Sequence, residues 1–185
     1  PVNPYHSLIC MWRRFIDDIS FIWSGTEALL LHFCETINTR SSALKFTYHY
    51  SASSVDFLDL TIQSHKGLLG TSLYRKPTER NTLFQYKSFH PKALKDGLPY
   101  GQFQRIRRNC KWRQDYFREA EALSNKLLER GYPRKLVKCA FKRAWYAPRE
   151  VILTPQPKKE TNRIVCVTTF CSHSNVVSKI IRKHW

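Results

Sequence analysis

The sequence predicts an α+β protein, in which a small antiparallel sheet with one packed helix precedes a basic helical bundle. Three observations support this class. Up to about residue 74, β-branched and aromatic residues form short runs separated by turn residues. Beyond Ser88, apolar residues recur at helical spacing. The positive charge of the chain is concentrated in the second of these parts.

The first element is a β-hairpin over residues 11–23. Two apolar arms flank the pair Asp17-Asp18, which places adjacent carboxylates at the tip. A helix is expected to follow as far as about Asn38, because Ser24 and Glu27 have the spacing of a capping box. Its apolar face is expected to contain four residues: Leu29, Leu30, Phe33 and Ile37.

Three further strands are expected over residues 44–50, 55–63 and 67–74. A serine-rich turn separates the first two, and Lys76-Pro77-Thr78 ends the third. Asp56 and Asp59 fall in this region, and we interpret both as structural or turn-associated carboxylates.

The second part predicts several helices. A short helix over 91–97 and another over 99–110 are expected, with Phe103 and Ile106 facing inward. Three arginines of the second helix are expected to face outward: Arg105, Arg107 and Arg108. Tyr116, Ala120, Leu123 and Leu127 predict a helix over 113–130 that ends at Gly131.

Pro133 is expected to begin another helix, whose apolar residues are Leu136, Val137, Ala140, Phe141 and Ala144. Residues 154–159 form a predicted linker. A strand over 164–170 and a short basic helix over 174–184 follow it. The resulting domains are 1–90, 91–146 and 147–185.

The net charge of +17 is unevenly distributed. Residues 1–74 hold five basic and six acidic side chains, whereas residues 75–149 hold twenty and six, a net of +14. Such a block attracts polyanions. Tyr, Phe and Trp are interleaved with the arginines, which favours nucleic acid over a membrane surface or a merely solvated one.

The hydropathy and the cysteines of the sequence bear on its partners and its compartment. The longest apolar runs are too short for a transmembrane helix, so no membrane partner is expected. Six scattered cysteines without a secretory signal indicate reduced thiols and an intracellular protein, in nucleus or cytoplasm. Cys166, Cys171 and His173 raise a zinc site, but their spacing matches no standard finger, and a strand explains the same residues. The start at Pro1 suggests a chain cut from a longer one.

The Asp17-Asp18 pair is the candidate catalytic and metal-binding site. Adjacent carboxylates on a turn repel one another unless a cation neutralises them. Mg²⁺ binds such oxygens and keeps waters or substrate phosphates as its other ligands. Two such ions can clamp the attacking and leaving oxygens of a phosphoryl transfer. Alone, two Asp residues in a turn are better explained by the ordinary turn preference of Asp. The hydrophobic strands on both sides make the pair more specific, because burial of both arms leaves the carboxylates as the only polar groups.

Several short motifs in this order resemble the Penelope-like retroelement reverse transcriptases. The motifs are Phe15-Ile16-Asp17-Asp18, the stretch 44–50, Phe57-Leu58-Asp59, Leu73-Tyr74-Arg75-Lys76-Pro77-Thr78, Ser88-Phe89-His90-Pro91, Leu98-Pro99-Tyr100, Arg105-Ile106-Arg107-Arg108 and Arg130-Gly131-Tyr132-Pro133. The resemblance covers roughly residues 12–185, and the combination is more specific than any single motif.

The resemblance implies the C-terminal part of a polymerase palm, with Mg²⁺ held by Asp17 and Asp18. It also implies a primer-gripping turn over residues 74–89 and a helical thumb over about 92–146, followed by a connector. The expected partner is an RNA or DNA template-primer, with nucleotides as substrates. The expected nucleic-acid contacts are Tyr74, Arg75, Lys76, Lys87, Arg105, Arg107, Arg108 and Arg113.

The chain departs from that family by lacking the earlier palm strand with its third carboxylate, and the fingers. Metal binding is therefore expected to be weak, and the chain to be a truncated reverse transcriptase that is inactive alone. The alternative is a non-catalytic module of the helix-turn-helix type, formed by the helices over 92–97, 99–110 and 113–130. Arg105, Arg107 and Arg108 would then occupy its second helix.

Overall fold

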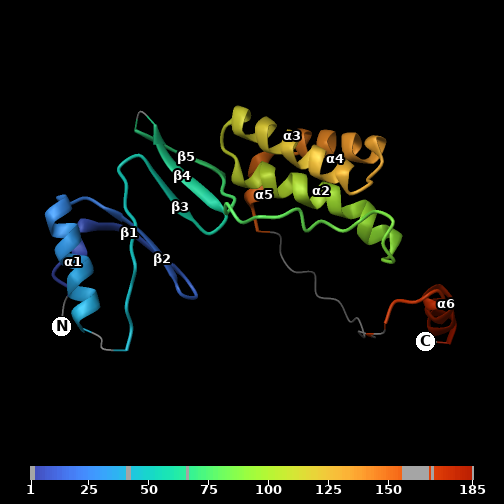
Figure 1. The fold of residues 1–185 in the computed structure, drawn as a ribbon, viewed down its shortest axis with the longest axis horizontal. Coiled ribbons are helices and arrows are strands. Elements are labelled where there is room, and N and C mark those ends of the chain that lie inside the picture. Colours follow the sequence, from blue (N-terminus) through green and yellow to red (C-terminus); the bar gives the residue numbers. More distant parts are fainter. Residues whose placement is uncertain (1–2, 41–42, 66, 156–166, 168, 185) are drawn as a thin grey trace. The chain divides into compact units, whose positions relative to one another are not determined.

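The computed structural model describes residues 3–40, 43–65, 67–155, 167 and 169–184. It divides the chain into two compact units, Pro1–Pro77 and Thr78–Trp185 (Figure 1). The first unit contains two small antiparallel sheets and a helix, and the described elements of the second are all helical. The predicted α+β class is confirmed. None of the described helices has the length and apolar character needed to cross a membrane.

The first unit begins with the predicted hairpin. After a short 3-10 helix, His6–Leu8, strand β1 (Ile9–Phe15) pairs in antiparallel fashion with β2 (Asp18–Trp23). Phe15 lies opposite Asp18, so the turn consists of Ile16 and Asp17. The hairpin and the position of the carboxylates at its tip are confirmed.

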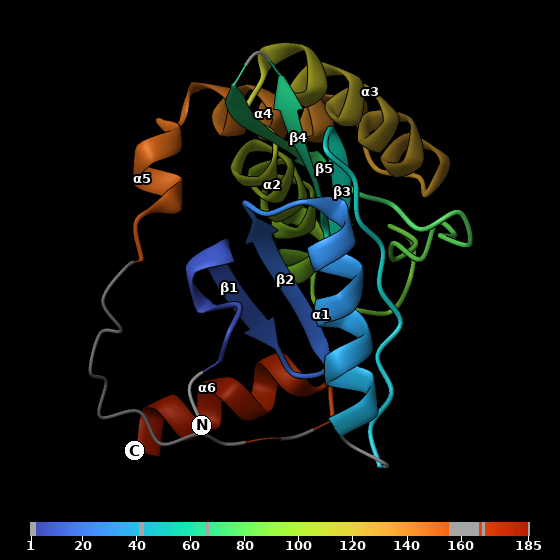
Figure 2. The ribbon, with the colours of Figure 1, turned by 90° about the vertical axis from the view of Figure 1, so that its left-hand side faces the viewer.

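Helix α1 (Glu27–Arg40) packs on this hairpin, as the ribbon shows from another side in Figure 2. Its buried residues are Leu30, Phe33 and Cys34, which meet Tyr5, Ile9, Phe21 and Trp23. Two expectations were wrong here. Leu29 is exposed, and Cys34 takes its place in the core. The capping predicted for Ser24 is the second. Ser24 donates to the Leu8 carbonyl at 3.1 Å, whereas Thr26 Oγ1 accepts the Leu29 N–H at 3.4 Å, so Thr26 caps the helix.

The second sheet has three strands: β3 (Ser54–Phe57), β4 (Leu60–His65) and β5 (Leu68–Leu73). The single strand expected over 55–63 is therefore wrong. Leu58 has a φ of 54° and forms a two-residue turn with Asp59, so the chain reverses within that run. The strand expected at the end of this region is confirmed as β5.

No strand forms over residues 44–50, contrary to expectation. Side chains of α1 hold this segment instead. The Asn38 amide donates to the Phe46 carbonyl at 2.9 Å and accepts the Phe46 N–H at 2.7 Å. Tyr50 donates to Glu27 at 2.5 Å. The Asn38 contacts occupy the backbone N–H and C=O of Phe46, which a strand would need. The described residues form two separate small sheets in place of the one expected.

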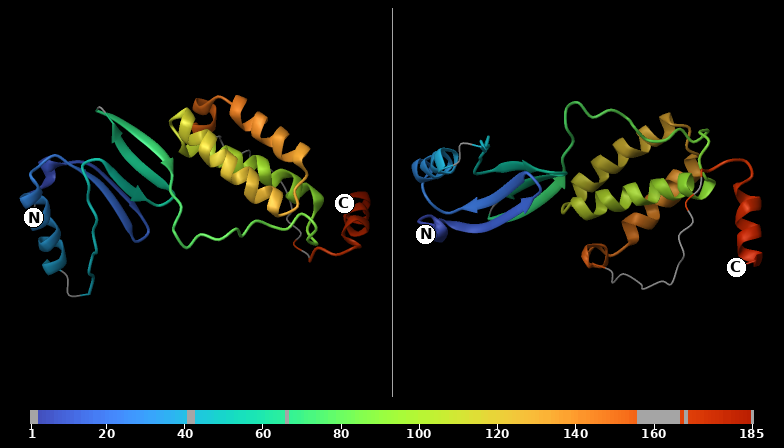
Figure 3. Two further views of the ribbon diagram at one scale, coloured as in Figure 1. Left: turned by 45° about the horizontal axis from the view of Figure 1, so that its top comes forward. Right: turned by 90° about the horizontal axis from the view of Figure 1, so that it is seen from below.

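The second unit contains α2 (Lys92–Asn109), α3 (Arg113–Glu129), α4 (Arg134–Tyr146), α5 (Arg149–Leu153) and α6 (Ser174–His184). Helices α2, α3 and α4 form a bundle (Figure 3). As predicted, Phe103 and Ile106 are buried in α2. The buried residues of α3 are the four expected: Tyr116, Ala120, Leu123 and Leu127. The helical bundle and the helix over 174–184 are confirmed.

The two short helices expected before residue 110 are one continuous helix, α2, with Pro99 inside it. A proline in a helix interior removes one backbone hydrogen bond and normally breaks or kinks the helix. Pro99 is fully buried in the bundle, so tertiary packing offsets that local preference.

The structure divides the chain at Pro77 rather than at residue 90. The segment after Thr78 lies on the helices without forming a helix or strand itself up to Pro91. The Tyr86 N–H donates to the Arg130 carbonyl at 2.8 Å, and the Asn81 amide donates to the Lys126 carbonyl at 3.1 Å. These bonds make it part of the helical unit.

The predicted strand over 164–170 and the zinc candidate Cys166 fall largely outside the residues that the structure describes. Val167, Thr169 and Phe170 are not in a strand. The helix α5 was not predicted.

Candidate nucleic-acid interface

A four-residue turn, Arg130–Pro133, joins α3 to α4. Gly131 has a φ of 81°, which a residue without a Cβ adopts at little cost. Its N–H donates to the Leu128 carbonyl at 2.9 Å, and the Tyr132 N–H donates to the Leu127 carbonyl at 3.1 Å. This pair of bonds is the Schellman arrangement, which ends α3 and sets the direction of the chain into α4.

The buried side chain of Tyr132 stabilises the turn between α3 and α4. It is 2% exposed, and its ring lies 5.1 Å from the ring of Tyr86, which is tied to Asp96 by a 2.9 Å hydrogen bond. Pro133 then precedes the first residue of α4 with an extended ψ of 132°. The helix–turn–helix geometry is therefore held by buried packing as well as by backbone bonds.

Helix α4 carries five basic residues and no acidic one: Arg134, Lys135, Lys138, Lys142 and Arg143. Val137, Ala140 and Ala144 bury the opposite face in the bundle. Lys135, Lys138 and Lys142 are all exposed and follow one side of the helix; we call these three residues the basic stripe. Within the described part of the chain, no carboxylate forms an ion pair with them.

The arginines predicted to face outward differ from one another. Arg105 and Arg108 are exposed. Arg107 is only partly exposed, with its guanidinium 5.1 Å from the centre of the Trp145 ring. Its Nε is buried and has no hydrogen-bond partner among the described residues. The outward orientation predicted for Arg107 is wrong, because Trp145 of α4 covers it.

Arg113 is exposed and lies at the start of α3. Its guanidinium lies 5.3 Å from the Phe117 ring centre and 5.5 Å from that of Trp145. These cation–π contacts hold the side chain near the bundle while leaving it accessible to a phosphate.

The other predicted contacts lie in different units. Tyr74 and Arg75 are partly exposed at the end of β5, and the Tyr74 N–H donates to the Asp59 carbonyl at 2.8 Å. Lys76 is exposed in the same unit, and Lys87 is exposed in the second. Their role as a primer-gripping turn stays a prediction.

The hairpin tip presents Asp17 and Asp18, both exposed. The preceding Ile16 has a φ of 53°, which is strained for a β-branched residue, and its carbonyl accepts a 2.8 Å hydrogen bond from Arg14. Among the residues described, no group of three His, Cys, Asp or Glu side chains could hold a metal ion. Asp56 accepts a 2.5 Å hydrogen bond from Thr61, and Asp59 lies in the second turn.

Residues 82–142 match the family model of the animal helix-turn-helix domain. The match includes α2, α3 and α4 as far as Lys142, together with the segment that leads into them. No curated protein and no solved structure matches the chain.

The sequence predicts the helix-turn-helix pair in the helices before residue 130, with its arginines on α2. The matched segment contains those helices and also α4. The glycine-containing turn joins α3 to α4, and α4 carries the basic stripe. Lys135, Lys138 and Lys142 were not among the predicted contacts. Their spacing of three and four residues in a helix without acidic residues was the signal available in the sequence.

Proposed function

We propose that the helical unit is a nucleic-acid-binding module of the helix-turn-helix type, in which α4 lies against the phosphates. The basic stripe carries this proposal, since three exposed lysines that no carboxylate of the described residues pairs with follow one side of the second helix. In helix-turn-helix proteins the second helix lies in the major groove.

The kind of charge points to backbone contacts rather than base recognition. Lysine presents a point charge on a flexible stem, whereas bidentate recognition of a base is typical of arginine. Binding through the stripe is therefore expected to be strongly salt-dependent and tolerant of sequence. Arg105, Arg108 and Arg113 supply further positive charge on the same bundle.

The test is the variant Lys135→Gln, Lys138→Gln and Lys142→Gln. We expect duplex affinity to fall roughly tenfold or more, and the slope of log K against log salt to flatten by about 0.9 for each phosphate that the variant no longer neutralises. Equal reductions in affinity are expected on unrelated duplex sequences, measured by anisotropy titration at several salt concentrations.

The matched control is Lys179→Gln, Arg182→Gln and Lys183→Gln on α6. It removes the same charge from another exposed basic helix. If both variants weaken binding equally, net charge rather than the stripe explains binding. If only some sequences are weakened, the stripe reads bases.

We further propose that the hairpin tip is the carboxylate pair of a reverse transcriptase palm, as the sequence resemblance implies. The observation that favours it is the pair of adjacent exposed carboxylates at the tip. Ile16 before them has the same left-handed conformation as Leu58 in the second turn, where a single Asp follows, so the carboxylate pair distinguishes the tip. Primer extension by a protein that joins this chain to an upstream palm and fingers segment tests the role.

A further inference from the structure

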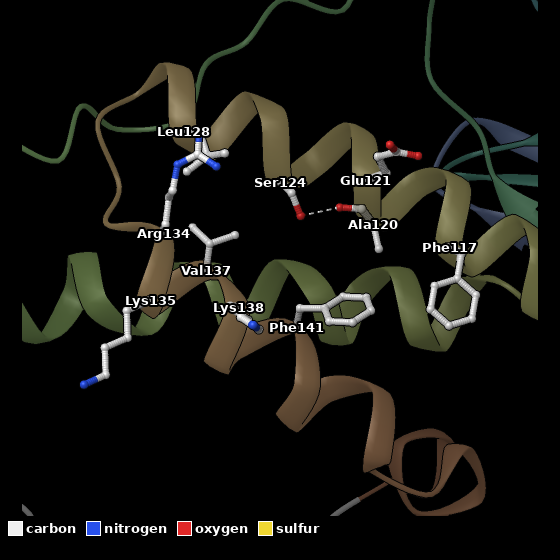
Figure 4. Close-up of a pocket in the computed structure, with 10 residues that line it drawn as sticks. All are labelled: Phe117, Ala120, Glu121, Ser124, Leu128, Arg134, Lys135, Val137, Lys138 and Phe141. Carbon is white, nitrogen blue, oxygen red and sulfur yellow. Dashed lines mark hydrogen bonds between the residues drawn. The ribbon is translucent and has the colours of Figure 1, made fainter.

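An open groove of about 780 Å³ lies between α3 and α4 (Figure 4). Its apolar lining includes Phe117 and Leu128 of α3 and Val137 and Phe141 of α4. The volume lies within the roughly 300–1,000 Å³ of pockets that hold small molecules.

Two phenyl rings form the aromatic part of the groove lining. The centres of Phe117 and Phe141 are 6.0 Å apart, and the ring planes are inclined by 48°. Phe141 also packs edge-on against the buried Phe103 at 5.7 Å, and Phe117 lies 4.8 Å from Trp145. Both rings are partly exposed, so the bundle supports them while they line the groove.

The charges on the two walls differ. Arg134, Lys135 and Lys138 line the α4 side, whereas the α3 side contributes the carboxylate of Glu121. Ser124 on the α3 side donates its hydroxyl to the Ala120 carbonyl at 2.7 Å. An occupant that complements the phenyl rings and the basic α4 side has a flat apolar part and a negative charge.

We propose that the groove receives one unpaired nucleotide at the end of a bound duplex. Its base would stack on Phe117 or Phe141, and its phosphate would pair with Arg134, Lys135 or Lys138. Every base has a face that can stack, so this contact is sequence-tolerant. The inference rests on the proposed nucleic-acid function and adds a substrate form, a duplex with a single-stranded end.

Nucleic acid fits the observations better than an acidic helical peptide. The lysines of the rim belong to the basic stripe, so a phosphate chain along the stripe leads directly to the groove. A peptide in the groove would have to compete with that chain for Lys135 and Lys138.

The experiment compares a blunt duplex with the same duplex carrying a three-nucleotide overhang, with 2-aminopurine as the first unpaired base. The full chain should bind the overhang form about tenfold more tightly, and the 2-aminopurine fluorescence should be quenched on binding. Both 5′ and 3′ overhangs are measured.

Phe117→Leu and Phe141→Leu keep apolar bulk and remove the stacking ring. Each should reduce the overhang preference and the quenching. Phe141→Leu should leave blunt-duplex affinity unchanged, whereas Phe117→Leu also removes a ring that holds Arg113 and should weaken both duplexes by a similar factor. Phe84→Leu is the control, because Phe84 is an exposed ring of the same unit that stacks on His90 outside the groove. Thermal unfolding of each variant checks folding, and Phe117→Leu alone remains decisive if Phe141→Leu unfolds.

The outcomes separate the two proposals. If the wild type binds neither duplex in a salt-dependent way, the proposed function fails. If it binds both equally, or if the preference persists in both leucine variants, the groove inference is overturned and the basic stripe stands. Displacement of an acidic amphipathic peptide, without any overhang preference, would assign the groove to a protein partner and also overturn it.

Discussion

Tyr116 shows how one residue of the helical core responds to its surroundings. It is fully buried, and its hydroxyl has no hydrogen-bond partner among the described residues. Burial raises the pKa of Tyr116 to about 12, although the nearby Arg107 charge acts in the opposite direction. The neutral phenol is therefore the form that the folded unit accommodates.

This pKa shift predicts a loss of stability at high pH. The unfolded tyrosine ionises near pH 10, whereas the folded one stays protonated until about pH 12. The contribution of the protonated Tyr116 to the free energy of unfolding is thus fully present below pH 10. The free energy of unfolding falls by about 2 kcal/mol as the pH rises from 10 to 12. Urea denaturation at pH 9 and pH 11.5 measures the change.

Tyr116→Phe is the matched variant for that measurement, because it removes the ionisable and unpaired hydroxyl. Its free energy of unfolding should fall less between the two pH values than that of the wild type. Parallel decreases in the two proteins would show that other groups, such as Tyr86 and Tyr132, account for the pH dependence.

The arginines of α2 show that the sequence predicts which side of a helix is buried, but not the exposure of each side chain. The pattern around Phe103 and Ile106 correctly placed the buried side of the helix. It could not distinguish Arg107 from Arg108, because the covering ring comes from Trp145, far along the chain. The basic stripe was in principle readable from sequence, whereas the groove depends on how α3 and α4 pack.

Among the elements, the turn between α3 and α4 has the clearest local cause. Gly131 provides the left-handed residue, and the nearest atom that an added Cβ would meet is Tyr86 Cβ at 3.9 Å. The site therefore has room for a side chain, and backbone strain alone sets the cost of substitution.

Gly131→Ala should lower the free energy of unfolding by about 1–2 kcal/mol, the cost of a left-handed conformation for a residue with a Cβ. Gly97→Ala is the control, since Gly97 lies inside α2 with no described atom near an added Cβ. There alanine should stabilise by about 0.5–1 kcal/mol. Chemical denaturation of the two variants measures opposite signs, and a stable Gly131→Ala protein would contradict the Schellman assignment.

Local patterns predicted some turns and missed others. Asp17-Asp18 between two apolar arms was recognisable as a hairpin tip. Leu58-Asp59 forms the same kind of two-residue turn inside a run that alternates like one strand. The backbone of Leu58 has a φ of 54°, and a leucine in the sequence does not predict such a conformation. Pro99 is the converse case, where burial overrides a strong helix-breaking signal.

In the whole molecule, the positive charge is concentrated in one of the two folding units. Pro1–Pro77 holds seven basic and six acidic residues, whereas Thr78–Trp185 holds twenty-four and eight. The net charge of +17 thus belongs almost entirely to the helical unit. The carboxylate hairpin lies in the nearly neutral unit, so the proposed chemistry and the proposed binding are assigned to separate parts.

That separation gives a prediction for activity. The isolated chain should not extend a primer on an RNA template with Mg²⁺, because two carboxylates supply only part of a two-metal site. Joined to an upstream palm and fingers segment, it should become active. Asp17→Asn or Asp18→Asn should then reduce the extension rate by about a hundredfold or more, without weakening duplex binding.

Asp56→Asn is the control, since an amide oxygen can still accept the Thr61 hydrogen bond. It should leave extension unchanged. Robust extension by the isolated chain, or an active Asp18→Asn protein, would remove the hairpin from the catalytic role.

Among the residues that the structure describes, each unit buries one cysteine in its own core: Cys34 in the first and Cys110 in the second. Cys10, Cys139 and Cys171 are exposed, and burial raises the pKa of the Cys34 thiol. An alkylating reagent should therefore mark the exposed three in the native protein and reach Cys34 or Cys110 only when the surrounding unit opens. Mass spectrometry of the labelled peptides would follow the two openings separately in one sample.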